Sequence, residues 1–166
     1  MVLSLNRCTD EITMKMAAPP VSRIVLADDD RDHGLLFRHI LKKIRPLAEI
    51  QIVQNGEELL KILGTIRPEI LFLDLNMPCK NGFDCLEEIR KTESLKTLPV
   101  VVYSSSTQMS DIQRSYLQEA DLYMVKPFNA EHLKTALESV LTMDWRQASS
   151  FKRHYYINNR FVPFTA

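Results

Sequence analysis

Glycine is scarce in this chain, with only four among 166 residues. Neither GxGxxG nor GxxxxGK followed by Ser or Thr occurs, so a glycine-rich loop that cradles a nucleotide phosphate is excluded. The three cysteines, Cys8, Cys79 and Cys85, are odd in number and lack CxxC spacing. A disulfide scaffold or a zinc site is therefore not expected.

Long apolar runs and an excess of either charge are also missing. No run approaches the ~20 residues that a membrane-spanning helix needs, and acidic residues stand where a signal peptide would be apolar. Twenty-one basic residues balance twenty-one acidic ones, whereas a surface devoted to nucleic acid is strongly basic. We therefore expect a soluble, cytoplasmic protein that does not bind a membrane, and nucleic acid is not a favoured partner.

Four short apolar runs indicate buried parallel strands. Runs of this kind, bounded by polar residues, suit strands that are covered on both faces. They occupy residues 24–27, 70–73, 100–103 and 122–125. A fifth run, residues 49–52, alternates apolar and polar residues and favours an edge strand with one wetter face.

Helical periodicity fills the intervals between these strands. Apolar residues at helical spacing predict helices around residues 37–44, 59–66, 83–89, 109–116 and 133–140. Five strands alternating with five helices predict an α/β fold, a doubly wound five-stranded parallel sheet with helices on both faces. Because ligands of such sheets bind outside the carboxyl ends of the strands, the functional residues are sought there.

Polar side chains suited to phosphoryl chemistry follow four of the predicted strands. Residues 28–30 are all Asp and follow the first strand, Asp74 follows the third, Ser104 the fourth and Lys126 the fifth. Carboxylates that converge at one edge need a compensating cation, and Mg²⁺ prefers such oxygen ligands. Lys126 and Ser104 could each bind a phosphoryl oxygen. The set predicts phosphoryl transfer without a general base.

Each of these residues also has an ordinary structural interpretation. An Asp after a strand often caps the following helix, so Asp30 and Asp32 are expected to cap the first helix, as Asn129 caps the last. A lone serine belongs with loop chemistry, and a lone lysine is usually solvated. The joint placement of complementary charges at four strand ends favours the functional interpretation.

At these landmarks, residues 23–143 resemble the receiver domain of two-component response regulators, the family of the bacterial chemotaxis regulator. The matching segments are RIVLADDD (23–30), ILFLDLNMPCKNGFD (70–84), LPVVVYSSS (98–106) and ADLYMVKPF (120–128). The resemblance implies a flavodoxin-like receiver fold with strand order 2-1-3-4-5.

The resemblance also implies a phosphorylation site and a metal site. Asp74 would be the nucleophile that accepts a phosphoryl group from a phosphohistidine. Asp29 and Asp74 would bind Mg²⁺ directly, Asp28 would support the ion through water, and the backbone carbonyl of Asn76 would complete the protein's share. The implied donor is a sensor histidine kinase or a histidine phosphotransfer protein, and the target is an unidentified protein.

The remaining matching residues are implied to form a switch. Lys126 would hold a phosphoryl oxygen, aimed by a cis bond to Pro127. Ser104 would move toward the phosphoryl group, and Tyr123 would rotate inward as Ser104 vacates its space. Asn76 and Ser106 would flank the site and influence the lifetime of the phosphate. An aromatic residue on an edge strand is also ordinary packing, so the role of Tyr123 stays open at this point.

Two other functions are weighed against a phosphorylated signalling domain, which is not an enzyme beyond its own phosphorylation and dephosphorylation. A phosphatase similar to haloacid dehalogenases also forms an aspartyl phosphate, but it needs an acidic group where this chain has Asn76. A pseudo-receiver would bind its partner regardless of phosphate, and the retention of every expected site residue disfavours it. Since about 23 residues follow Met143, we expect a stand-alone receiver.

The chain then divides into an N-terminal arm (1–22), the receiver domain (23–143) and a basic, aromatic C-terminal tail (144–166). Six of the 13 aromatic residues lie in 145–166, together with four basic and no acidic residues. Residues 155–162 favour a hairpin with an Asn-Asn turn. An isolated hairpin is marginally stable, so packing on the receiver, of this chain or of a second copy in a homodimer, is favoured over docking on a partner or on single-stranded nucleic acid.

Overall fold

The computed structural model describes residues 21–165, so most of the expected N-terminal arm (1–22) and Cys8 lie outside the described residues. The main sheet has five strands: β1 (Arg23–Ala27), β2 (Glu49–Val53), β3 (Ile70–Leu73), β4 (Val100–Ser104) and β5 (Leu122–Val125). The helices that alternate with them are α1 (Arg31–Ile44), α2 (Gly56–Leu63), α3 (Gly82–Lys91), α4 (Met109–Leu117) and α5 (Ala130–Leu141). No helix within residues 21–165 is long and apolar enough to cross a membrane.

The main sheet is parallel throughout, and its strands lie in the order β2-β1-β3-β4-β5. This confirms the predicted fold and strand order. The three central strands consist almost entirely of buried residues, because helices cover both of their faces. The edge strand β2 alternates exposed and half-buried residues, as its alternating sequence predicts.

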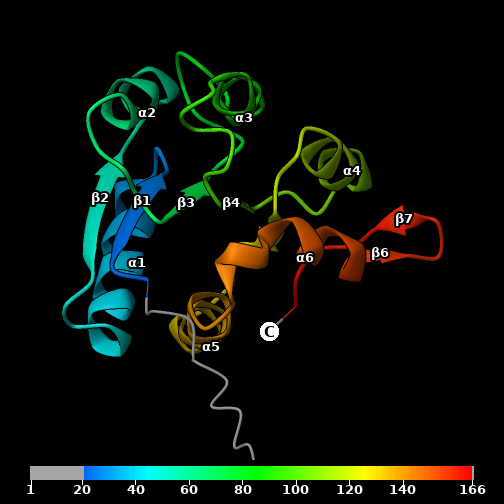
Figure 1. Ribbon diagram of the computed structural model, residues 1–166. Coiled ribbons are helices and arrows are strands. Elements are labelled where there is room, and N and C mark those ends of the chain that lie inside the picture. The colour runs from blue at the N-terminus through cyan, green and yellow to red at the C-terminus, as the bar shows by residue number, and fades with distance from the viewer. Residues whose placement is uncertain (1–20, 166) are drawn as a thin grey trace, which may run out of the picture.

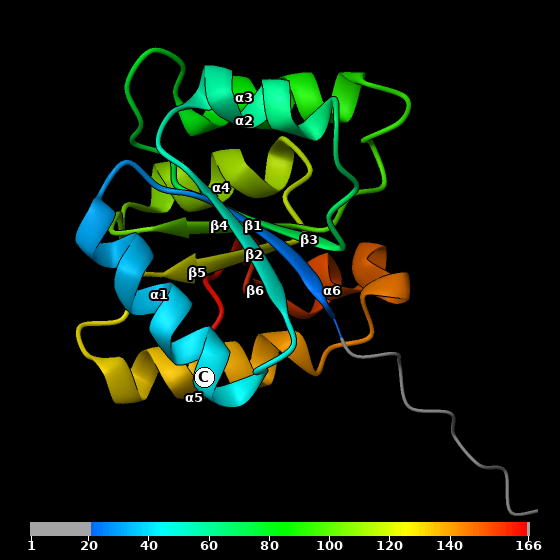
Figure 2. The ribbon, with the colours of Figure 1, turned by 90° about the vertical axis from the view of Figure 1, so that its left-hand side faces the viewer.

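Helices cover the sheet on two sides (Figures 1 and 2). Helices α1 and α5 pack together on one face, and α2, α3 and α4 lie on the other. The core accordingly has two parts. On the side of α1 and α5, the ring of Phe37 meets those of Phe72 and Tyr103 edge to face, with centroids 4.9 and 5.6 Å away. Tyr116 and Tyr123 are the largest buried residues on the other side.

The second helix is shorter than its apolar spacing predicts. The expected pattern runs to Ile66, but α2 ends at Leu63, and Ile66 lies beyond it and is exposed. Gly64 follows the last helical residue, and its N–H donates to carbonyls of the final turn. Because glycine weakens a helix, the apolar residue two positions later is not enough to extend it.

Asparagine or aspartate side chains cap the first turns of α1, α2, α3 and α5. Asp30 accepts hydrogen bonds from the backbone N–H groups of Asp32 and His33, and Asn129 accepts one from that of His132. The predictions for Asp30 and Asn129 are therefore confirmed. The prediction for Asp32 is wrong, because Asp32 lies inside the first turn of α1 and its backbone is capped by Asp30.

The C-terminal tail forms a 3-10 turn, a helix and a hairpin, which Figure 1 shows beside α4. They are η1 (Trp145–Gln147), α6 (Ala148–His154), β6 (Tyr156–Ile157) and β7 (Arg160–Phe161). The hairpin turn is made by Asn158 and Asn159, with φ of 50° and 64°, a conformation that asparagine tolerates better than most residues. The ring of Phe161 stacks on Tyr116 in α4. The predicted hairpin and its packing on the receiver are thus confirmed.

Candidate functional site

Three carboxylates lie together at the carboxyl ends of β1 and β3. Asp28 and Asp29 directly follow β1, and Asp74 directly follows its neighbour β3. Each offers one oxygen, and the three oxygens lie within 4.8 Å of one another. Asp28 and Asp74 are buried, whereas Asp29 is exposed. The parallel pairing of these two strands is what brings residues 45 positions apart in sequence to one edge of the sheet.

Lys126 joins the two buried carboxylates. Its Nζ lies 2.7 Å from Oδ2 of Asp74 and 2.8 Å from Oδ2 of Asp28. The backbone N–H of Lys126 donates to the carbonyl of Ser104, which anchors the end of β5 to β4. The prediction of a cis bond between Lys126 and Pro127 is wrong, because residues 21–165 contain no cis peptide. The long, flexible lysine side chain reaches both carboxylates from a trans backbone.

Burial and pairing act in opposite directions on the charges of this site. Burial raises the pKa of the Asp28 carboxyl, and the neighbouring Lys126 ammonium counteracts only part of this effect. Burial also disfavours the charge of Lys126, but its close contacts with the carboxylates of Asp28 and Asp74 outweigh this effect and raise the pKa of the ammonium. Lys126 is therefore held as a cation between the two carboxylates.

The donor set fits a hard divalent cation. One ammonium faces three carboxylates, so the cluster retains an excess of negative charge when all are ionised. Oδ2 of Asp28 is buried and has no well-directed hydrogen bond, its contact with Lys126 being an ion pair. Carboxylate oxygens are the ligands that Mg²⁺ and Mn²⁺ prefer, whereas softer metals select thiolate or imidazole.

Ser104, at the carboxyl end of β4, and Tyr123, in β5, are both engaged with the loop after β4. The hydroxyl of Ser104, which is fully buried, accepts a hydrogen bond of 3.3 Å from the N–H of Ser106. The hydroxyl of Tyr123 donates to the carbonyl of Ser106 at 2.9 Å, and the tyrosine is 0 % exposed. Tyr123 thus already points inward in this structure, whereas the sequence leads us to expect that arrangement only after phosphorylation.

The residues expected to flank the site lie on its outer side. Asn76 is exposed, and its backbone N–H donates to Oδ1 of Asp74 at 3.2 Å. Ser106 is half-buried, and its hydroxyl donates to Oδ2 of Asp111 at 2.6 Å. The hydrogen bond that orients Asp74 therefore comes from the backbone of Asn76 and not from its side chain.

Two residues of the site escaped the sequence interpretation. A Cβ atom on Gly82, the first residue of α3, would lie 2.2 Å from the carbonyl oxygen of Asp74, so only glycine fits beside the acceptor. Gly82 lies in the segment 70–84 that resembles the receiver family, but no role is predicted for it from the sequence. His33, in the first turn of α1, places Nδ1 3.5 Å from Nζ of Lys126, and no sequence pattern marks it.

Replacing Lys126 by alanine is expected to destabilise the metal-free protein by about 3 kcal/mol, because two buried carboxylates would lose their shared cation. Mg²⁺ should recover much of this loss, since the ion would bind the folded chain and replace the missing positive charge. Urea unfolding with and without Mg²⁺ measures both effects. The exposed Lys61 gives the control, Lys61→Ala, and a loss below about 1 kcal/mol in Lys126→Ala would contradict the prediction.

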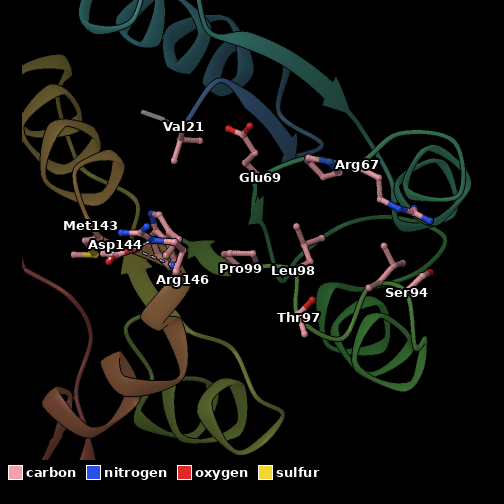
Figure 3. A pocket seen from close by; sticks show the side chains of 13 residues that line it. Val21, Arg67, Glu69, Ser94, Thr97, Leu98, Pro99, Met143, Asp144 and Arg146 are labelled. Atoms are coloured by element: carbon pink, nitrogen blue, oxygen red, sulfur yellow. Dashed lines mark hydrogen bonds and ion pairs between the residues drawn. The ribbon is translucent and has the colours of Figure 1, made fainter. Parts of the chain in front are cut away.

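A separate cavity of about 420 Å³ lies at the opposite, amino-terminal edge of the sheet (Figure 3). Val21, Glu69 and Pro99, which line it, stand just before β1, β3 and β4. Its charged side chains are engaged within the protein: Arg67 donates to the carbonyl of Leu63, and Arg146 pairs with Asp144. It contains none of the residues of the carboxylate site.

The comparisons with known proteins agree on one family. A family model described as the response regulator receiver domain matches residues 24–138, more than half of the chain. Response regulator Rcp1 of Synechocystis sp. is 29% identical over 128 residues, which cover 73% of this chain and 87% of that protein. The probable methanogenesis regulatory protein FilR2 of Methanothrix harundinacea is 29% identical over 123 residues, which cover 70% and 79%.

Solved structures give the same match. The Mn²⁺-bound form of Rcp1 has a TM-score of 0.66 at 27% identity, covering 74% of this chain and 95% of that one. The phosphorylated cyanobacterial phytochrome response regulator RcpA has a TM-score of 0.67 at 29% identity, covering 72% and 91%. The chemotaxis response regulator CheY4 of Vibrio cholerae has a TM-score of 0.65 at 26% identity, covering 73% and 99%.

Proposed function

From the premise that this chain belongs to the response regulator receiver domain family, we propose that it accepts a phosphoryl group on Asp74. Receiver domains act in two-component signalling and are not classical enzymes, so the activity sought is a single, regulated phosphorylation. The observation that carries the proposal is the contact of Lys126 with both Asp28 and Asp74 beside a third carboxylate. These groups come from three different strand ends and complement one another in charge.

The donor is a phosphohistidine of a sensor histidine kinase or of a histidine phosphotransfer protein. An oxygen of Asp74 forms a bond to phosphorus while the bond from phosphorus to the histidine nitrogen breaks, and that nitrogen keeps the electron pair. The N–H of Asn76 holds the carboxylate in place through Oδ1. Lys126, released from Oδ2 of Asp74, moves onto an oxygen of the incoming phosphoryl group.

Asp28, Asp29 and Asp74, with the backbone carbonyl of Asn76, would hold Mg²⁺. The bound ion supplies charge neutralisation and in-line positioning of the transferring group. Support for a divalent ion comes from the carboxylate cluster and from the Mn²⁺-bound form of the relative Rcp1. With the ion bound, Lys126 would no longer be the sole positive charge beside the three carboxylates.

Ser104 and Tyr123 would transmit the effect of phosphorylation to the surface that binds a protein target. We propose that the protein acts in the cytoplasm. Ser104 would turn its hydroxyl from the loop to the phosphoryl group, and the loop after β4 would follow because Ser106 binds both Ser104 and Tyr123. Asn76 and Ser106 would influence how fast water removes the phosphate. The switched surface belongs to the proposed receiver domain (23–143), and its target is an unidentified protein or a second copy of the chain.

Labelling of the chain by acetyl phosphate tests the proposal. With Mg²⁺, intact-mass measurement should detect the addition of one phosphoryl group, which hydroxylamine should remove because the product is an acyl phosphate. Without divalent ions the addition should fall to background, since the carboxylates would repel the incoming phosphate. A chain that stays unmodified in Mg²⁺ would instead favour a pseudo-receiver, and continuous release of phosphate from small esters would favour a phosphatase.

A further inference from the structure

The C-terminal tail lies against α4 (Figure 1) and pairs with the outer edge of β5. The ring of Phe161 stacks on that of Tyr116 in α4, with centroids 4.7 Å apart and planes 22° from parallel. The side-chain amide of Gln113, also in α4, donates to the carbonyl of Phe161 at 2.8 Å. One face of the hairpin is therefore fixed to α4 by both stacking and a hydrogen bond.

The end of the tail pairs with β5 itself. The N–H of Phe164 donates to the carbonyl of Tyr123 at 2.7 Å, and Phe164 forms a parallel bridge with Met124. Phe164 is only 9 % exposed and belongs to the core on the side of α5. The tail thus extends the sheet beyond β5 for a short distance, next to the tyrosine of the proposed switch.

The contacts continue from the tail to the phosphorylation site. The ring of Tyr116 stacks on that of Phe161, and its hydroxyl accepts a hydrogen bond of 3.1 Å from the backbone N–H of Tyr123. The backbone of Tyr123 therefore has two partners that involve the tail. Its N–H donates to Tyr116, which the tail covers, and its carbonyl accepts from Phe164 of the tail. Its own hydroxyl binds the loop at Ser106, whose N–H binds Ser104.

Charge favours a receiver as the surface for this tail, and the contacts above place it on the receiver of the same chain. Residues 145–166 carry four basic and no acidic side chains, and the chain has a net charge of zero, so residues 1–144 carry −4. The attraction is long-range and non-specific, whereas the stacking and the sheet pairing decide where the tail lies. Burial of the aromatic rings offsets the conformational entropy lost by ordering the tail.

We propose that the tail is an intramolecular ligand of the α4–β5 surface, which it contacts through Phe161 and Phe164, and that the tail thereby holds Tyr123 inward and strengthens phosphoryl binding at Asp74. The inference rests on the proposed function of Asp74 and adds a regulator to it. In the proposed switch, the phosphorylated state requires Tyr123 to point inward. A tail that already holds Tyr123 inward therefore lowers the free energy needed to reach that state. Coupling of this kind is reciprocal, so phosphoryl binding must also tighten the tail.

The first experiment compares two substitutions in the hairpin of the full chain. Phe161→Ala removes the stack on Tyr116, whereas Ile157→Ala changes an apolar residue of the same hairpin that is half exposed. The probe is beryllofluoride with Mg²⁺, an analogue of the phosphoryl group that cannot be transferred, and binding is followed by titration calorimetry. Phe161→Ala is expected to weaken binding about tenfold, and Ile157→Ala to leave it unchanged.

Equal or tighter binding by Phe161→Ala than by the unaltered chain would overturn the inference while leaving the function of Asp74 intact. An unaltered chain that fails to bind beryllofluoride would overturn the proposed function as well, so the two failures are distinguishable. Circular dichroism establishes whether each variant is folded.

A second measurement needs no variant. Hydrogen exchange of the Phe164 amide, which donates to Tyr123, is followed in the unaltered chain with and without beryllofluoride. Reciprocal coupling predicts that exchange slows by about the same tenfold factor when the analogue is bound. An exchange rate that does not change on binding would overturn the inference, even if Phe161→Ala does not fold.

Discussion

Replacement of Asp74 by asparagine is expected to reduce phosphoryl labelling of the chain to background. The amide has nearly the shape of the carboxylate but lacks a nucleophilic anionic oxygen, so no acyl phosphate can form. Acetyl phosphate with Mg²⁺ and intact-mass measurement give the readout. The fold should persist, because the pair between Lys126 and Asp28 remains and the residue stays polar at the end of β3.

Asp144→Asn is the matched control for this substitution. Asp144 lines the cavity at the opposite edge of the sheet and pairs with Arg146, so its loss alters one carboxylate without touching the site. Its labelling should equal that of the unaltered chain. Undiminished labelling of Asp74→Asn would show that another residue accepts the phosphoryl group, and the assignment of the acceptor would be wrong.

Gly82→Ala is expected to destabilise the protein by about 3 kcal/mol and to slow labelling of Asp74. The added Cβ would lie 2.2 Å from the carbonyl oxygen of Asp74 and 2.7 Å from Cα of Leu75. Both neighbours are backbone atoms, so the clash is relieved only by shifting the segment that carries the acceptor. Urea unfolding measures the stability, and the initial rate with acetyl phosphate measures the displacement of Asp74.

Gly34→Ala provides a comparison at another helical glycine. There the added Cβ would meet only side-chain atoms of Ile52, Cγ2 at 3.3 Å and Cδ1 at 3.6 Å, and alanine favours a helix over glycine by up to about 1 kcal/mol. The change in stability should therefore stay within about 1 kcal/mol, with normal labelling. If both substitutions cost the same, crowding of Asp74 is not the cause of the effect at Gly82.

The sheet could be predicted because each strand carries its own signal. Residues 70–73 and 100–103 are short, continuous apolar runs, which are typical of strands buried on both faces. The length of α2 could not be predicted, since Ile66 continues the apolar spacing after Gly64 has ended the helix. Helix α6 was not expected either, because its sequence ASSFKRH has little apolar periodicity.

The site was predictable where it depends on strand order and less so where it depends on packing. Parallel pairing alone brings Asp28 and Asp74 together, and Lys126 follows from the same edge. The need for Gly82 follows from the close approach of α3 to the acceptor, which only coordinates reveal. The inward position of Tyr123 likewise depends on packing, since its hydroxyl donates to Ser106 and its backbone partners are Phe164 and Tyr116.

The pairing of Phe164 with β5 is also expected to limit aggregation of the protein. The two outer strands of the sheet differ: β2 carries Glu49 and alternates polar residues, whereas β5 reads Leu-Tyr-Met-Val without a charge. An uncharged outer strand with unpaired backbone groups is a template for association with other chains and for aggregation. By taking up one of these backbone groups and covering Met124, the last residues of the chain protect its most vulnerable strand from neighbours.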